Sequence, residues 1–284
     1  MHHFTTLIDS NTLSEHLSRD DLTLFDCRFD LGNVQWGEAE YARAHLPGAF
    51  YLHLDRDLSG PITARSGRHP LPDPERFANR LAELGAGSDT QIVAYDQGNG
   101  AYAARLWWLA RWIGLRNVAV LDGGIAAWRA AGLPLETTVR TPRPRTLPVS
   151  LAADAWVSTE TVDELRRRPG NLLIDARGAE RFAGRNETLD PIAGHVPGAR
   201  NRPFLDNLGA DGRFLPALVL RQRFGTLLGS VAPSSLIAMC GSGVTACHNL
   251  LALEHAGLTG ARLYAGSWSE WIRDPRRPIA TGMY

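Results

Sequence analysis

One cysteine lies where catalytic groups often lie, between a short apolar run and an amphipathic segment. The stretch reads "SLIAMCGSGVTACHNLLALEHAGL", from Ser235 to Leu258, and Gly-Ser-Gly directly follows Cys240. The glycines allow the backbone to curl so that consecutive N–H groups point inward and form a concavity for an anion. A helix after the loop would add unpaired N–H groups and a partial positive charge. Such a place stabilises the nucleophilic thiolate, so the pattern favours covalent catalysis over a buried structural thiol, which is the alternative.

Short apolar strands that alternate with helical patterns would position this loop. Helical patterns cover Ala101–Ile113 and Val244–Ala256. We expect strands at Leu22–Asp26, Gln91–Tyr95, Ala119–Leu121, Leu172–Asp175, Leu236–Met239 and Arg262–Tyr264. Short buried strands alternating with helices predict an α/β fold with a mainly parallel sheet. Sites in such sheets lie at the carboxyl ends of strands, which is where Cys240 falls.

The sequence also contains an internal duplication. "LFDCRFD" recurs as "LIDARGA", "AHLPGA" as "GHVPGA", "IVAYDQGNG" as "LIAMCGSG" and "DGGIAAW" as "AGSWSEW", always in the same order. Asp96 occupies the place in the first copy that Cys240 has in the second. Self-similarity at a fixed spacing indicates a duplicated structural unit. We therefore predict one domain over residues 1–138, a proline-rich linker over 139–150 and a second domain over 151–284.

Composition and charge exclude several classes of function. The chain has 284 residues, 44% hydrophobic and 21% charged, with a formal net charge of zero. This balance indicates a globular protein with no attraction for nucleic acid or an acidic membrane. The sequence shows neither a membrane-spanning run nor a signal peptide, and its cysteines form no disulfide framework. We therefore expect a reducing, cytoplasmic setting.

The duplicated layout, the paired "HLPGA" and "HVPGA" turns and the "CGSGVT" loop together resemble the tandem-domain rhodanese-like sulfurtransferases. The loop is most similar to that of the 3-mercaptopyruvate sulfurtransferase branch. The resemblance implies two rhodanese-like domains, each a mainly parallel central sheet flanked by helices, of which only the second is catalytic. It implies transfer of sulfur from 3-mercaptopyruvate through a Cys240 persulfide, without a cofactor. The acceptor would be cyanide, a small thiol or a thioredoxin-like protein.

The resemblance also implies roles for individual residues. Ser242 and His69 would join Asp55, or its neighbour Asp57, in a proton relay. Arg181 would bind the carboxylate of the donor, since an arginine fork matches a planar carboxylate. The expected site residues are Cys240, Ser242, His69 and Asp55 for catalysis, and Arg181, Gly241, Gly243, Val244 and Thr245 for substrate binding.

One departure from the family pattern bears on the donor. The mercaptopyruvate branch has a second donor-binding arginine in "EPR" ahead of its Pro-Gly turn, whereas this chain reads "ETLDPIAGHVPG". Leu189 or Asp190 lies near the place of that arginine, and Arg185 is the candidate to replace it. Thiosulfate:cyanide sulfurtransferase is therefore the alternative activity.

Two more distant functions are weaker candidates. A cysteine phosphatase needs an arginine six residues after its nucleophile, where this chain has Ala246, so a bound phosphate would lack its bidentate clamp. A non-catalytic binding module has no need for a cysteine flanked by both loop glycines. We see no spacing of histidine and cysteine that predicts a metal site.

Residues that occur in both copies need not be catalytic, since the first copy lacks the cysteine. We expect His45 and His195 to stabilise turns through hydrogen bonds, and Trp128 and Trp271 to belong to the core. The strand-end pairs of aspartate and arginine, Asp26 with Arg28 and Asp175 with Arg177, predict internal salt bridges. Cys247, which follows Cys240 on the same helical stripe, is expected in the core.

Overall fold

The computed structural model describes residues 3–283 of the chain. These residues divide into two compact units that follow the duplication, except that two short segments group with the other half. The first unit comprises Met1–Gly60, Pro72–Ala152 and Ala210–Phe214, and the second comprises Pro61–Leu71, Ala153–Gly209 and Leu215–Tyr284. Segment 61–71, which contains His69, thus belongs to the second unit together with Cys240. Within residues 3–283, no helix is long and apolar enough to cross a membrane.

Each unit is built on a five-stranded sheet within the described residues, and the two sheets have the same strand order. The first runs β1-β5-β4-β2-β3 and the second runs β6-β10-β9-β7-β8, with all of these pairs parallel. The strands are β1 (Leu7–Ile8), β2 (Leu22–Asp26), β3 (Ala49–Tyr51), β4 (Gln91–Tyr95), β5 (Val118–Leu121), β6 (Trp156–Val157), β7 (Leu172–Asp175), β8 (Arg200–Asn201), β9 (Leu236–Met239) and β10 (Arg262–Tyr264). The predicted α/β fold with two tandem domains is confirmed.

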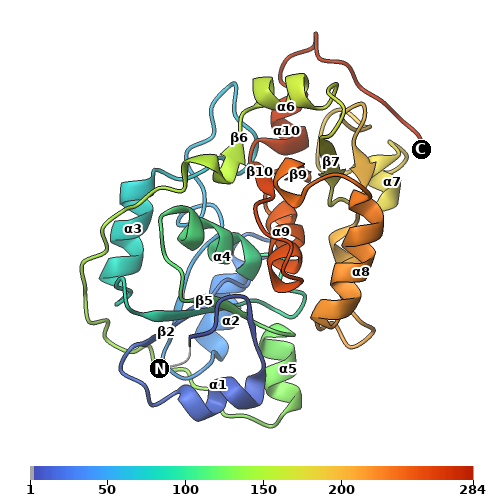
Figure 1. Ribbon diagram of the computed structural model, residues 1–284. Helices are drawn as coiled ribbons and strands as arrows, with labels where there is room; N and C mark the ends of the chain where they lie inside the picture. Colours follow the sequence, from blue (N-terminus) through green and yellow to red (C-terminus); the bar gives the residue numbers. More distant parts are fainter. Residues whose placement is uncertain (1–2, 284) are drawn as a thin grey trace. The chain divides into compact units, whose positions relative to one another are not determined.

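Helices cover both faces of each sheet (Figure 1). They are α1 (Ser10–His16), α2 (Trp36–Arg43), α3 (Pro74–Glu83), α4 (Ala103–Trp112), α5 (Gly124–Ala130), α6 (Thr159–Leu165), α7 (Ala179–Phe182), α8 (Ala217–Leu228), α9 (Thr245–His255) and α10 (Ser267–Trp271). In the second unit, Val162 of α6 and Trp268 of α10 pack with alternate strand residues such as Ile237 and Met239. The intervening residues face the opposite way, where α9 packs against β9 and β10. Burial on both faces explains why these strands are apolar throughout.

The duplicated residues stabilise the same features in both units, as expected. Nδ1 of His45 lies 2.8 Å from the carbonyl oxygen of Tyr41, and Nδ1 of His195 lies 2.8 Å from that of Phe182. Each imidazole also stacks on the aromatic ring of the same partner. Because both histidines bind backbone near their Pro-Gly turns, they are structural residues.

A buried ion pair lies at the carboxyl end of an equivalent strand in each unit. Asp26 pairs with Arg28 at 2.6 Å, and Asp175 pairs with Arg177 at 2.7 Å. In each unit the arginine also donates to a backbone carbonyl, that of Ala44 or of Gly194. The predicted internal salt bridges are confirmed, and they fix the strand ends beside which the two loops lie.

The repeated tryptophans are core residues. Trp128 and Trp271 are fully buried, and their indole N–H groups donate to the carbonyl oxygens of Pro134 and Pro278. Each indole therefore ties its helix to the segment that follows it, which satisfies the one polar group a buried tryptophan carries.

Candidate active site

Cys240 lies at the carboxyl end of β9, and the loop that follows curls around its sulfur. The backbone N–H of Gly243 donates to the Cys240 Sγ at 3.1 Å, and that of Ser242 does so at 3.5 Å. Cys240 is buried, with 2% of the residue's surface exposed. Two inward-pointing amides at a buried sulfur are the arrangement that stabilises negative charge on it.

The start of α10 holds the loop in this conformation. The N–H of Cys240 donates to the hydroxyl of Ser267 at 3.0 Å, while Trp268 and Ser269 donate to the carbonyls of Cys240 and Gly241 at 3.0 and 2.9 Å. Ser267 itself has a left-handed φ of 53°, which few non-glycine residues adopt. The backbone N–H of Cys240 and the carbonyls of Cys240 and Gly241 are therefore paired before any substrate binds.

Gly243 is required by its backbone geometry. Its φ is +79°, in the left-handed region, and a Cβ there would overlap the carbonyl oxygen of Ala265. Gly241 has more freedom, because the atoms nearest to a Cβ there belong to the flexible guanidinium groups of Arg68 and Arg181, at 3.0 and 3.4 Å. The two glycines thus have different roles: Gly243 allows the turn, and Gly241 leaves room for the two arginines.

Val244 and Thr245, which the resemblance places in substrate binding, lie where α9 begins. Thr245 is its first residue and Val244 its N-cap, and the carbonyl of Val244 accepts from the N–H of Cys247 at 3.0 Å. These positions are adjacent to the loop in the chain. Direct contact with a donor stays a prediction.

Ser242 and His69 come together although they are far apart in the sequence. Nδ1 of His69 lies 2.7 Å from the Ser242 hydroxyl oxygen, and both side chains are buried. Backbone contacts seat segment 61–71 here: the N–H of Arg68 donates to the Ser269 hydroxyl at 3.0 Å, and a Cβ on Gly67 would lie 2.6 Å from the Gly266 oxygen. A histidine and a serine at this distance can share a proton, which the predicted relay requires.

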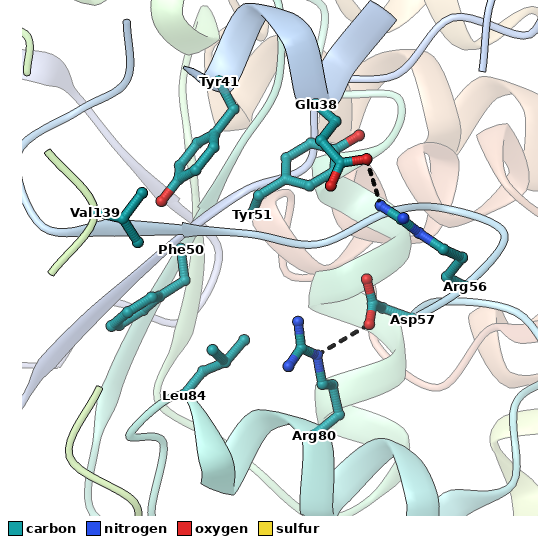
Figure 2. A pocket seen from close by; sticks show the side chains of 9 residues that line it. All are labelled: Glu38, Tyr41, Phe50, Tyr51, Arg56, Asp57, Arg80, Leu84 and Val139. Carbon is teal, nitrogen blue, oxygen red and sulfur yellow. Dashed lines mark hydrogen bonds and ion pairs between the residues drawn. The ribbon is translucent and has the colours of Figure 1, made fainter. Parts of the chain in front are cut away.

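Asp57 and Asp55, the two candidates for the acid of the relay, belong to the first unit. The Asp57 carboxylate accepts from the N–H of His53 at 2.8 Å and from Nε of Arg80 at 3.0 Å. Figure 2 shows this ion pair beside that of Glu38 with Arg56, at the edge of a cavity of about 440 Å³. Asp57 is therefore bound to local partners within its own unit. The place of Asp55 relative to His69 stays a prediction.

Arg181, the predicted donor-binding residue, lies beside Gly241 and is tied to acids of its own unit. Its guanidinium binds Glu187 at 2.8 Å and Asp190 at 3.2 Å, and 24% of its side chain is exposed. Burial acts to raise the pKa of Glu187, but hydrogen bonds from Arg181 and from backbone amides outweigh it and keep the pKa below its ordinary value. Arg181 is thus held by an ionised carboxylate.

The second cation beside the loop is Arg68, which belongs to none of the motifs in the sequence. Arg68 forms an ion pair with Asp190, whereas Arg185, the candidate replacement, pairs with Glu180 in an exposed ion pair at 2.6 Å. The one signal in the sequence was that Arg68 directly precedes the predicted relay histidine. Its partner, Asp190, stands 122 residues further along the chain, so spacing could not reveal the pair.

The corresponding loop of the first unit encloses a carboxylate instead of a thiol. Asp96 follows β4 as Cys240 follows β9. Its carboxylate accepts four backbone N–H bonds of 3.0 to 3.3 Å, from Gly98, Gly100, Tyr102 and Ala103. Burial is the largest influence on the pKa of Asp96 and raises it, while the four amides act to lower it. The same turn therefore points backbone amides at the side chain in this position in both units.

The two other thiols lie in different surroundings. Cys247 is buried, and its Sγ donates to the carbonyl oxygen of Gly243 at 3.3 Å, so it supports the loop from the core as expected. Burial and the charges of Asp26, Asp96 and Asp57 raise the pKa of the Cys27 thiol. The environment of Cys27 therefore does not stabilise a thiolate. Among residues 3–283, no group of histidine, cysteine and carboxylate side chains could hold a metal ion.

Comparison with known proteins gives consistent results for both halves of the chain. The model of the rhodanese-like domain matches twice, at residues 9–131 and 158–274. A probable 3-mercaptopyruvate sulfurtransferase of Pseudomonas aeruginosa is 50% identical over 97% of this chain and 98% of its own length. A thiosulfate sulfurtransferase of Cricetulus griseus is 31% identical over 98% of this chain and 96% of its own length.

A solved structure agrees with these similarities. The crystal structure of a 3-mercaptopyruvate sulfotransferase from Escherichia coli, described as having the rhodanese fold, superposes with a TM-score of 0.81. The two sequences are 32% identical, and the match covers 94% of this chain and all of that one.

Proposed function

Since the chain belongs to the tandem rhodanese-like sulfurtransferases, we propose that it moves a sulfur atom from 3-mercaptopyruvate to a thiophilic acceptor through a persulfide on Cys240. The observation that carries this proposal is the pair of N–H bonds from Ser242 and Gly243 to the Cys240 sulfur. Amides fixed in this way stabilise a thiolate before the reaction and the negative charge of a persulfide after it.

The first half-reaction makes the persulfide. The Cys240 thiolate attacks the sulfur of 3-mercaptopyruvate, an S–S bond forms, and the donor's C–S bond breaks. The electron pair of that bond stays with the leaving group, which departs as the enolate of pyruvate and takes up a proton. Ser242 and His69, 2.7 Å apart beside the loop, would deliver this proton, with Asp55 as the predicted third member of the relay.

The second half-reaction regenerates the thiolate. A nucleophilic acceptor attacks the outer sulfur of the persulfide, the S–S bond breaks, and its electron pair returns to the Cys240 sulfur. Cyanide would leave as thiocyanate, and a small thiol or a thioredoxin-like protein would leave as its own persulfide. Dividing the transfer into two steps in this way is covalent catalysis with ping-pong kinetics.

The first unit supports the proposed role of the loop amides. There the carboxylate of Asp96 occupies the turn and accepts its N–H groups. Asp96 fills that turn, so the turn of the first unit offers neither a nucleophile nor a place for a substrate anion. We therefore assign sulfur transfer to the second unit alone.

Thiosulfate transfer is the second candidate, because relatives of both kinds resemble the chain over nearly its whole length. The neutral Gly241-Ser242 pair after the cysteine favours a donor with one negative charge over the dianion thiosulfate. Steady-state transfer of sulfur to cyanide, measured with both donors, tests the choice. We expect kcat/KM for 3-mercaptopyruvate to exceed that for thiosulfate, and the reverse order would favour the alternative.

A cysteine variant tests the mechanism in the same assay. Cys240→Ser should abolish transfer from both donors, whereas Cys27→Ser, a matched loss of a buried thiol in the first unit, should retain it. Substantial turnover by the Cys240→Ser variant would refute the persulfide mechanism.

A further inference from the structure

A carboxylate lies between the two arginines beside the catalytic loop. Arg68 binds one oxygen of Asp190 through Nη1, and Arg181 binds the other through Nη2 at 3.2 Å. Both guanidinium groups lie near the Cα of Gly241, since a Cβ there would come within 3.0 and 3.4 Å of them. A carboxylate of the protein therefore already bridges the two arginines that lie beside Gly241.

The charges around this bridge balance. Arg177 binds both Asp175, at 2.7 Å, and Glu187, at 3.4 Å. Glu187 in turn binds Arg181 at 2.8 Å. The cluster as a whole consists of three arginines, Arg68, Arg177 and Arg181, and three carboxylates, Asp175, Glu187 and Asp190. Its formal charge is zero before a donor arrives.

Only part of the cluster is accessible to a donor. The side chains of Glu187 and Asp190 are each 2% exposed, whereas those of Arg68 and Arg181 are 24% exposed. Donor anions can therefore reach the outer N–H groups of the two arginines while Asp190 stays behind them. An anion in that position is attracted by two guanidinium groups and repelled by one buried carboxylate. The repulsion is proportional to the charge of the anion, so it is twice as large for a dianion as for a monoanion.

We propose that Asp190 sets the donor selectivity of the site by the charge it contributes. Its carboxylate offsets one guanidinium, and this offset weakens the attraction for a dianionic sulfur donor twice as much as the attraction for a single carboxylate. This inference rests on the proposed sulfurtransferase function and deepens it, because it names the residue that distinguishes 3-mercaptopyruvate from thiosulfate. Specificity then arises because this carboxylate repels the dianionic donor more strongly than the monoanionic one.

The test compares both donors in variants that differ in charge at this position. Asp190→Asn keeps the shape of the side chain and one oxygen acceptor but removes the charge. We expect the ratio of kcat/KM for thiosulfate to that for 3-mercaptopyruvate to rise about tenfold, mainly through a lower KM for thiosulfate. Asp190→Glu restores the charge and should return the ratio toward that of the wild type. The ratio does not depend on how much of each preparation is folded.

Two further variants serve as controls. Glu180→Gln makes the same change in net charge at an exposed ion pair, with Arg185, and should leave the ratio unchanged. Arg68→Gln makes the cluster more negative and should lower the ratio. This opposite shift decides the question if Asp190→Asn does not fold.

The outcomes separate this inference from the function on which it rests. An unchanged ratio in both Asp190→Asn and Arg68→Gln, with both donors still consumed, would overturn the role of Asp190 and leave the sulfurtransferase function standing. Equal losses of kcat for both donors in Asp190→Asn, without a change in KM, would make Asp190 a structural residue only. Absence of transfer from either donor by the wild-type protein would overturn the proposed function itself.

Discussion

The two loop glycines provide a matched pair of variants for testing how the loop activates Cys240. In Gly243→Ala, the new methyl group must adopt a φ of +79°, which costs an L-residue roughly 1–2 kcal/mol, and it overlaps the Ala265 carbonyl oxygen. The loop has to shift to relieve this overlap. The N–H of residue 243, now 3.1 Å from the sulfur, moves with the loop. Loss of one fixed donor to a developing negative charge lowers kcat by about 100- to 1,000-fold.

Gly241→Ala should behave differently, because the atoms nearest to its new Cβ are the ends of two flexible arginine side chains. We expect kcat to stay within a few-fold of the wild type and the KM for 3-mercaptopyruvate to rise as Arg68 and Arg181 are displaced. Single-turnover formation of the persulfide separates the two effects, and thermal unfolding verifies that both variants are folded. If Gly243→Ala retains the kcat of the wild type, the loop amides do not activate the sulfur and our reasoning is refuted.

Two other predictions concern the proton relay and an acid-sensitive ion pair. His69→Ala and Asp55→Asn should each lower the turnover of 3-mercaptopyruvate by about 100-fold or more, and that of thiosulfate much less. The reason is that only 3-mercaptopyruvate releases an enolate that must be protonated. Asp57→Asn is the matched control, because Asp57 binds Arg80 and the His53 amide; equal losses with both donors would contradict the relay. Glu187→Gln should lower the free energy of unfolding by about 3 kcal/mol at neutral pH, because it breaks a buried pair with Arg177 and Arg181. The pKa of Glu187 is below its ordinary value, so this contribution is complete above that value and is lost as the pH falls through the lowered pKa. Urea unfolding at several pH values should therefore show the difference from wild type shrinking in acid, and a difference that stays constant would contradict the assignment.

The central strands of the fold could be predicted because burial on both faces makes them continuous apolar runs. β2, β4, β7, β9 and β10 have the predicted bounds, and β5 begins one residue earlier than expected. The outer strands β1, β3, β6 and β8 were missed. They are two or three residues long, too short to carry a recognisable periodicity, and tertiary pairing alone defines them.

The candidate site could be predicted only where its residues belong to a motif. The Cys240 loop follows from a strand, two glycines and a helix, which are local features. The pairing of His69 with Ser242 was reached only through the resemblance, because 173 residues separate them. The pair of Arg68 with Asp190 could not be predicted, since it forms only when segment 61–71 packs with the rest of the second unit. Likewise, the sequence revealed Asp96 in the place of the cysteine, but not that its carboxylate binds the loop amides.

The most direct test of the persulfide mechanism is to locate the transferred sulfur. Protein incubated with 3-mercaptopyruvate in the absence of an acceptor, then digested and analysed by mass spectrometry, should carry one additional sulfur atom on the peptide that contains Cys240. Addition of cyanide should remove that sulfur in step with the release of thiocyanate. Additional sulfur on Cys27 or Cys247 instead, or turnover without sulfur on any cysteine, would contradict the mechanism.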